Sequence, residues 1–126
     1  MCRHPHIAPC WAVTVEADFE AAGFPCMMCC HIADGNFHCL VPYSDDAEGL
    51  ALLRDIEDNM IKRVLDVGGT ISGEHGIGLG KKRHMVKEHG ELYIDMMRQI
   101  KKALDPQQIF NPGKIFDMDA RQQTKL

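Results

Sequence analysis

The sequence predicts an α+β fold in which a few antiparallel strands carry helices on one face. Two short apolar runs, residues 26–33 and 36–41, flank an Asp-Gly pair, which is typical of a tight β-hairpin. Apolar residues at helical spacing mark two longer stretches outside this hairpin, at residues 46–67 and 91–104, and good helix formers fill residues 14–22. A length of 126 residues suits one small domain with a modest core.

The first half of the chain is expected to run helix, strand, strand, helix. Residues 14–22 contain good helix formers and end at Gly23, and Pro25 follows. The helix over 46–67 is expected to begin at a cap supplied by Ser44 or Asp45. Its apolar face is formed by residues three and four positions apart, which are Leu53, Ile56, Met60, Val64 and Val67. Residues 1–12 show no clear period and are expected to be loop.

The second half begins with a glycine-rich loop at residues 68–80. A short helix is expected from Lys81 to His89, ended by Gly90. The helix over 91–104 is expected to bury one apolar face, formed by Tyr93, Met96, Met97, Ile100 and Leu104. The segment after Asp105-Pro106 keeps four large apolar residues and is therefore expected to be ordered as far as Phe116.

Composition narrows the classes of function. A formal net charge of -4 argues against a dedicated nucleic-acid binder, which would carry a basic patch. No apolar run approaches the roughly 18–20 residues that a membrane-spanning helix needs. Five of the six cysteines lie in the first thirty residues, but no secretory signal is visible, so free thiols in a reducing compartment are expected.

Two histidines flank the predicted hairpin turn. If Asp34 and Gly35 form a two-residue turn, Ala33 faces Asn36, Ile32 faces Phe37 and His31 faces His38, the pairs being counted outward. Directly opposed residues share one face of a hairpin, so the two imidazoles could bind one metal ion, while Ile32 and Phe37 would enter the core. The alternative is that the histidines simply occupy the strand surface.

The glycine-rich loop offers a third ligand. Glu74 would complete a set of two histidines and one carboxylate, which suits a divalent ion such as zinc, manganese or iron. Such an ion would acidify a bound hydroxyl, and His75 would be placed to take the proton. Taken alone, Glu74 could equally be an exposed loop acid and His75 a loop imidazole bound to backbone.

Other interpretations of these segments are weaker. The glycine-rich loop lacks the spacing of a Walker A or dinucleotide-binding motif, although Lys81, Lys82 and Arg83 could still meet an anion. The sequence CMMCC could belong to a zinc or iron–sulfur site, but no second CxxC follows it. A rival function is therefore a non-catalytic metal-binding module that uses Cys26, Cys29, Cys30, His31 and His38. A further rival is an inactive fragment, or a subunit that completes a flavoprotein supplied by another chain.

Three segments together resemble a known family. They are HIADGNFHCLV, GGTISGEHGIGLGKK and MRQIKKALDPQQIFNPGKIF. They resemble the C-terminal end of FAD-linked 2-hydroxy-acid dehydrogenases of the vanillyl-alcohol-oxidase type. This group includes D-lactate dehydrogenases (cytochrome), glycolate oxidase D-subunits and D-2-hydroxyglutarate dehydrogenases. The resemblance runs from about Thr14 to Phe116, and FHCLVPYSDDAE is most similar to the D-lactate branch.

The resemblance implies a site and a reaction. His31, His38 and Glu74 would bind a divalent metal, zinc or manganese, near the flavin, and His75 would act in substrate activation or proton abstraction. Asn111 would be a polar contact to FAD. The substrate would be a D-2-hydroxy acid, most simply D-lactate, which is oxidised to the 2-oxo acid with hydride transfer to flavin. Electrons would pass to cytochrome c or another carrier.

The resemblance also implies an organisation. Residues 13–117 would be part of the family's C-terminal cap domain, residues 118–126 a polar tail, and residues 1–12 an unmatched start. The family's FAD-binding domain lies upstream of this region, so a chain of this extent is expected to be a fragment and inactive alone. Its location would be mitochondrial in a eukaryote, and otherwise cytoplasmic or peripheral to a membrane.

Overall fold

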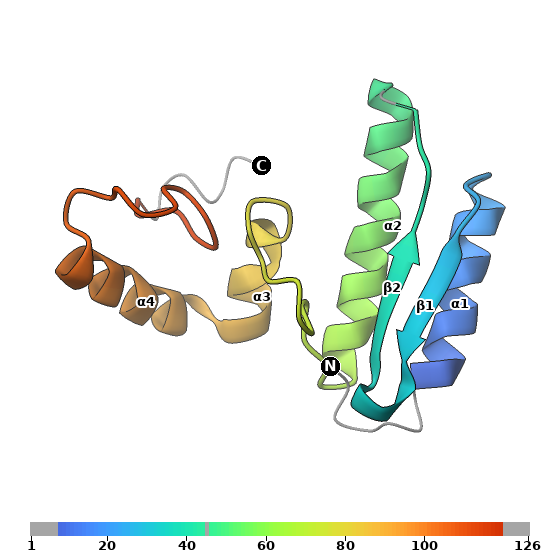
Figure 1. Cartoon of the computed structure of the whole chain (residues 1–126), viewed down its shortest axis with the longest axis horizontal. Coiled ribbons are helices and arrows are strands. Elements are labelled where there is room, and N and C mark those ends of the chain that lie inside the picture. Colours follow the sequence, from blue (N-terminus) through green and yellow to red (C-terminus); the bar gives the residue numbers. More distant parts are fainter. Residues whose placement is uncertain (1–7, 45, 120–126) are drawn as a thin grey trace. The chain divides into compact units, whose positions relative to one another are not determined.

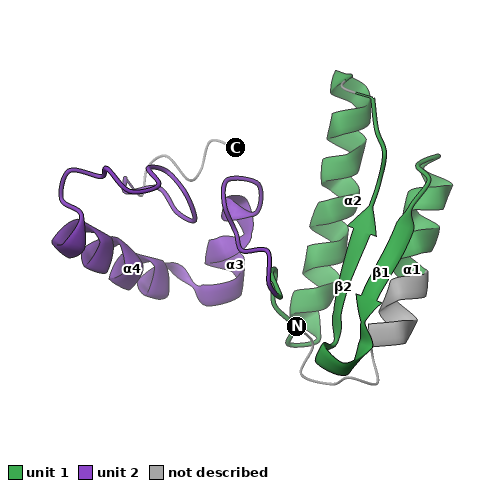
Figure 2. Cartoon of the chain, viewed as in Figure 1, with its two compact units in different colours: residues 1–73 green, residues 74–126 purple. Residues whose placement is uncertain are grey.

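The computed structural model describes residues 8–44 and 46–119, which form two compact units (Figures 1 and 2). The first unit extends to Gly73 and the second begins at Glu74. Unit 1 contains α1 (Ala8–Ala21), β1 (Met27–His31), the 3₁₀ turn η1 (Ile32–Asp34), β2 (Asn36–Leu40) and α2 (Ala47–Asp66). Unit 2 contains η2 (Lys82–His84), α3 (Met85–His89) and α4 (Glu91–Leu104). The predicted α+β class is confirmed.

Helices α1 and α2 pack with one face of the β1–β2 hairpin to make the core of unit 1. Val15 and Phe19 from α1 and Ile56 from α2 are its buried centre. Phe37 and Cys39 of β2 are packed against that centre, as are Leu53 and Met60 of α2. The opposite face of the hairpin carries no helix of unit 1 (Figure 1) and is therefore open for polar side chains.

Helix α1 begins at Ala8, earlier than the predicted start at residue 14. The expectation of loop was therefore wrong for residues 8–12, while residues 1–7 lie outside the described part of the chain. Pro9 misled the prediction, but it falls in the first turn of the helix. Proline is tolerated there because the backbone N–H that it lacks would have no partner within the helix.

The hairpin has a longer turn than predicted, and its register is shifted by two residues. His31 pairs with Asn36, Cys30 with Phe37 and Cys29 with His38. The turn is η1 followed by Gly35 in the left-handed conformation (φ 63°), which glycine adopts without a steric penalty. Ile32 lies in this turn and is 65% exposed, so its predicted core position was wrong, whereas Phe37 does pack on the core.

Helix α2 matches its predicted length, but its cap is a different residue. Asp46 accepts a hydrogen bond from the backbone N–H of Gly49, at 2.7 Å, and Ser44 donates its hydroxyl to the same carboxylate. The Ser44 bond and the Gly49 bond both hold the pKa of Asp46 below its usual value. Ser44 therefore supports the cap without being it, and Asp45, the other predicted cap, lies outside the described residues.

Helix α4 has the predicted bounds but turns a different face inward. Tyr93, Met96, Ile100 and Leu104 are all more than half exposed, so the predicted buried face was wrong. Ile94 and Arg98, one turn apart, are buried instead. The guanidinium of Arg98 donates to Glu91, to Asp95 and to the backbone carbonyl of Asp117. Ion pairs and backbone contacts therefore orient α4 as much as apolar burial does.

The segment after α4 is fixed by the buried carboxylate of Asp105. This carboxylate accepts hydrogen bonds from the backbone N–H groups of Ile109 and Phe110, at 2.9 and 3.0 Å, and from the ammonium of Lys101. The Lys101 bond is the main cause that lowers the pKa of Asp105, and the two amide bonds act in the same direction. A second contact is the ion pair between the Nζ atom of Lys82 and the Oδ1 atom of Asp117, at 2.7 Å. The segment up to Phe116 is therefore held in place at both ends, as expected of an ordered segment.

Among the described helices, none combines the length and the apolar character needed to cross a membrane.

We expect Asp105→Ala to loosen the segment at 105–117 while leaving unit 1 intact. Amide exchange at Ile109 and Phe110 should quicken about tenfold or more, because each amide loses a charged acceptor. In the unsubstituted chain, the protection of these two amides from exchange should be complete above about pH 4, because the ordinary pKa of Asp is about 3.9. It should be lost as the pH falls through the lower folded pKa, because the unfolded chain takes up the proton first. Asp55→Ala, an exposed change on α2, is the control. Unchanged exchange in Asp105→Ala would contradict this role.

Candidate metal centre

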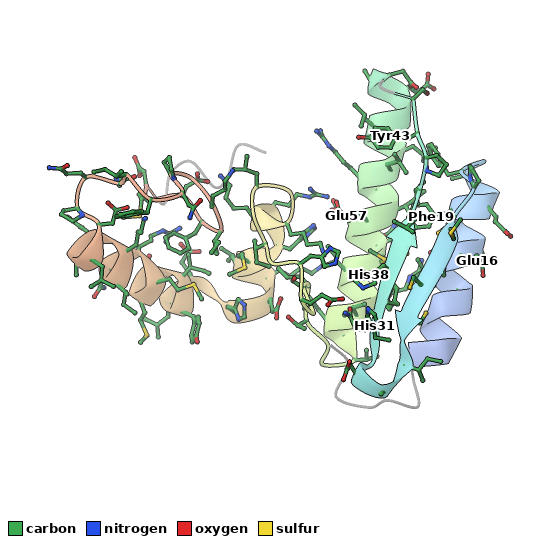
Figure 3. The ribbon with its side chains drawn as sticks, in the orientation of Figure 1. Glu16, Phe19, His31, His38, Tyr43 and Glu57 are labelled. Carbon is green, nitrogen blue, oxygen red and sulfur yellow. The ribbon has the colours of Figure 1, made fainter. Side chains whose placement is uncertain are left out.

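His31 and His38 lie together on the helix-free face of the hairpin. His31 ends β1 and His38 is the third residue of β2. Their ring centroids are 5.2 Å apart and the ring planes are nearly perpendicular, at 83°. His31 is exposed and His38 is half-buried. Figure 3 shows both rings on the strands, away from α1.

The predicted direct pairing of the two histidines was wrong, yet they do meet. His31 is opposite Asn36 and His38 is opposite Cys29, so the histidines are diagonal neighbours. Side chains alternate between faces with a period of two, and the register is displaced by two residues from the predicted one. A displacement of two keeps each side chain on its face, which is why the pair survived an incorrect register. A displacement of one would have separated them.

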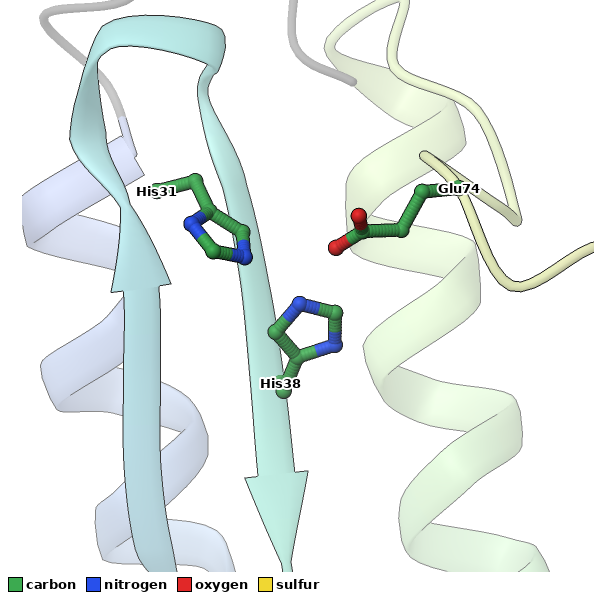
Figure 4. A group of neighbouring side chains, drawn as sticks. All are labelled: His31, His38 and Glu74. Atoms are coloured by element: carbon green, nitrogen blue, oxygen red, sulfur yellow. The ribbon is translucent and has the colours of Figure 1, made fainter.

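Gly73 brings the chain back against this face of the hairpin. A Cβ atom on Gly73 would lie 2.7 Å from the side-chain amide of Asn36, so any larger residue here would require that amide to move. Asn36 pairs with His31 and points to the same face. The residue after Gly73 is Glu74, and its carboxylate is directed toward the two imidazoles (Figure 4).

The three predicted ligands are therefore neighbours. One nitrogen from each of His31 and His38 and one carboxylate oxygen of Glu74 all lie within 4.8 Å of one another. Two imidazole nitrogens and one carboxylate oxygen form a donor set that suits zinc or manganese and leaves coordination positions open. The exposed rim at His31 and Glu74 leaves room for a small molecule to approach these positions.

His75 follows Glu74 directly and its side chain is 74% exposed. Its Nε2 atom lies 4.0 Å from a carboxylate oxygen of Glu74. The imidazole is therefore next to the carboxylate, but it is not one of the three grouped donors. The imidazole is therefore exposed beside the three grouped donors.

The cysteines are divided between the two faces of the hairpin. Cys29 shares the face of the histidines, whereas Cys30 and Cys39 alternate onto the other face. Cys26 packs against the core together with Cys39. The mixed ligand set of the rival metal-binding module is therefore not gathered in one place. Burial raises the pKa of the Cys39 thiol to about 12 and also raises that of Cys26, so both thiols are protonated at neutral pH.

Asn111 lies in a loop of unusual backbone geometry in unit 2. Gln108, Asn111 and Ile115 all have positive φ, at 53°, 47° and 68°. For a β-branched residue such as Ile115 this is a rare conformation, and it is held by a hydrogen bond from its N–H to the carbonyl of Gly78. Asn111 is exposed and lines a small cavity of about 200 Å³ with Phe110 and Lys114. The strain at Ile115 had no signal in the sequence beyond the nearby Pro112-Gly113 turn.

Much of the basic cluster at residues 81–83 is engaged within unit 2. Lys82 pairs with Asp117 and also donates to the carbonyl of Gly113, at 3.4 Å. Arg83 donates to the carbonyl of Gly80. These contacts indicate that Lys82 and Arg83 hold the loop in place, rather than bind an anion.

Comparison with known proteins places the chain in a family. The family model for the C-terminal domain of FAD linked oxidases matches residues 5–115. The mitochondrial D-lactate dehydrogenase [cytochrome] of Kluyveromyces lactis is 41% identical over 104 residues, which is 82% of this chain and 18% of the relative. The mitochondrial D-lactate dehydrogenase [cytochrome] 1 of Saccharomyces cerevisiae is 45% identical over 89 residues, which is 71% of this chain and 15% of the relative.

A bacterial relative shows a similar match. Glycolate oxidase subunit GlcD of Bacillus subtilis is 36% identical over 93 residues, or 72% of this chain and 20% of the relative. The chain thus spans a minor part of the length of each relative. The matched region includes the hairpin, Glu74 and the loop of Asn111. The resemblance seen in the sequence motifs is thereby confirmed, and the chain belongs to the family of FAD-linked oxidases, matching its C-terminal domain.

Proposed function

We propose that this chain is the metal-bearing part of an FAD-dependent dehydrogenase that oxidises a D-2-hydroxy acid, D-lactate in the simplest case, to the 2-oxo acid. The observation that carries the proposal is the grouping of His31, His38 and Glu74 on an open face. The names of the yeast relatives support D-lactate as substrate, while GlcD extends the class to glycolate.

His31, His38 and Glu74 would hold a divalent ion, zinc or manganese, and their donor chemistry fits it. When bound, such an ion polarises a substrate hydroxyl and makes its proton easier to remove. His75 is the residue that would take this proton, since its imidazole lies beside Glu74 and is largely exposed to solvent. His38 is the less exposed of the two histidines and would fix the position of the group.

FAD, held mainly by residues outside this chain, would supply the hydride acceptor. Asn111 would contribute a polar contact to it, which fits its exposed position in a strained loop beside a small cavity. The names of the yeast relatives support cytochrome c, or another carrier, as the electron acceptor and mitochondria as the location in a eukaryote. In a prokaryote the location would be cytoplasmic or peripheral to a membrane.

The metal assignment predicts a loss of binding on removing either histidine. His31→Ala or His38→Ala should weaken Co²⁺ or Mn²⁺ binding to the 126-residue chain by about tenfold or more, because a site with three ligands retains only two. His89→Ala is the matched control, since that imidazole stacks on Tyr93 in unit 2. Isothermal titration and Co²⁺ absorption spectra are the measurements. Unchanged affinity in both hairpin variants would refute the ligand set.

The assigned roles of Glu74 and His75 can be separated. The experiment replaces the matching region of the Saccharomyces cerevisiae relative with residues 14–116 of this chain. Glu74→Gln should then lower metal content and D-lactate oxidation together. His75→Asn should retain the metal and lose about 10²–10⁴-fold in kcat, as expected for a missing general base. If His75→Asn instead keeps more than a tenth of kcat, or loses the metal, the proton-transfer role is wrong.

A third expectation follows from the proposal that FAD is held mainly by residues outside this chain. The 126-residue chain, expressed alone and purified, should be colourless and should reduce no dye in the presence of D-lactate. Asn111 and its loop provide one polar edge, which is too little contact to retain a free flavin. The measurement is the visible absorbance spectrum with and without added FAD. A yellow protein that keeps FAD through gel filtration would overturn this expectation.

A further inference from the structure

We propose a second metal site in unit 1, formed by Cys26, Met28 and Cys39, that binds a soft monovalent ion, Cu(I), through sulfur alone. It is independent of the proposed hydroxy-acid chemistry.

The sulfur atoms converge because of the hairpin register. Met28 of β1 is directly opposite Cys39 of β2, and the Sγ atom of Cys39 lies 3.4 Å from the Sδ atom of Met28. Cys26 precedes Met28 by two positions, and its thiol hydrogen-bonds that of Cys39. Two thiols and one thioether therefore have Cys39 as their common neighbour.

This cluster is separate from the candidate metal centre. Met28 and Cys39 alternate onto the face of the hairpin that packs toward α1 and α2, whereas His31 and His38 occupy the other face. The two donor sets also differ in chemistry. Imidazole and carboxylate suit zinc or manganese, while thiolate and thioether ligands select Cu(I). Zinc ordinarily takes four nitrogen, oxygen or thiolate ligands, and this cluster supplies two thiols and a thioether.

Cys26 and Met28 of this cluster face an open groove, and acidic side chains lie nearby. An open groove of about 990 Å³ is lined by Cys26, Met28 and Glu16, together with apolar neighbours such as Val41. Glu16, on α1 (Figure 3), is close enough for its charge to act on both thiols, and Glu20 acts on Cys26. Two carboxylates beside the sulfur atoms attract a cation and help to offset its loss of hydration.

The binding step balances without any electron transfer. Copper enters as Cu(I) and leaves as Cu(I), two Cu–S bonds form with Cys26 and Cys39, and their two thiol protons pass to the buffer. The thioether of Met28 adds a third bond and releases no proton.

The test is a Cu(I) titration of the reduced 126-residue chain under anaerobic conditions, against a chromophoric Cu(I) chelator. We expect one Cu(I) per chain, with affinity at least about a hundredfold higher than for Zn²⁺, as sulfur ligands predict. Cys39→Ala should weaken binding about a hundredfold and Met28→Leu about tenfold, since each removes a donor. X-ray absorption should report sulfur neighbours and no nitrogen.

Cys29→Ser is the matched control, because Cys29 lies on β1 next to Met28 but its thiol is on the opposite face of the hairpin. It should leave Cu(I) affinity unchanged. Cys39 packs against the core, so circular dichroism must confirm that Cys39→Ala folds, and Cys26→Ser, nearer the groove, repeats the test. Tighter binding of Zn²⁺ than Cu(I), nitrogen ligands in the spectrum, or equal losses in Cys29→Ser and Cys26→Ser would overturn the proposal. Loss of the candidate metal centre through His31→Ala should not alter Cu(I) binding.

Discussion

The alternation of side chains along the β1–β2 hairpin is the constraint on which the rest of unit 1 depends. Each strand has five residues, and each residue is committed to one of two faces. One face packs Phe37 and Cys39 against the two helices and so makes the core. The other face is left for His31 and His38. The packing of the core and the placement of the two histidines therefore both depend on which face each strand residue occupies.

A glycine lies next to the third residue of the candidate metal centre. Gly73 rests against the amide of Asn36, and this contact places the following residue, Glu74, beside the histidines. The carboxylate is thus delivered by a close backbone approach to the sheet. Metal binding at such a site would fix a loop that is otherwise tied to the hairpin by local packing. This arrangement explains why a glycine-rich segment carries the acidic ligand and the adjacent imidazole.

Unit 2 is organised by charge more than by a large apolar core. Ile94 is fully buried, but Arg98 and Asp105 are nearly as buried and bind backbone groups of the C-terminal segment. Buried charged groups require partners, and here each has several, which gives the loops around them defined positions. The same bonds hold the segment that contains Asn111 and the strained Ile115, so a loop of uncommon geometry is kept by its anchors.

The sequence by itself determined the order of the elements and pointed to the residues grouped in the candidate metal centre, because periodicity, glycine and the spacing of His31 and His38 are local signals. It also determined the family, through motifs that comparison confirmed.

Only the tertiary structure decided the register of the hairpin, the face that α4 turns inward and the division of the cysteines between two faces. These depend on contacts between distant residues: the 3₁₀ turn lengthened the loop by two positions, and the partners of Arg98 lie outside the apolar pattern of α4. The histidines were found despite the wrong register because a shift of two residues preserves the face of a strand.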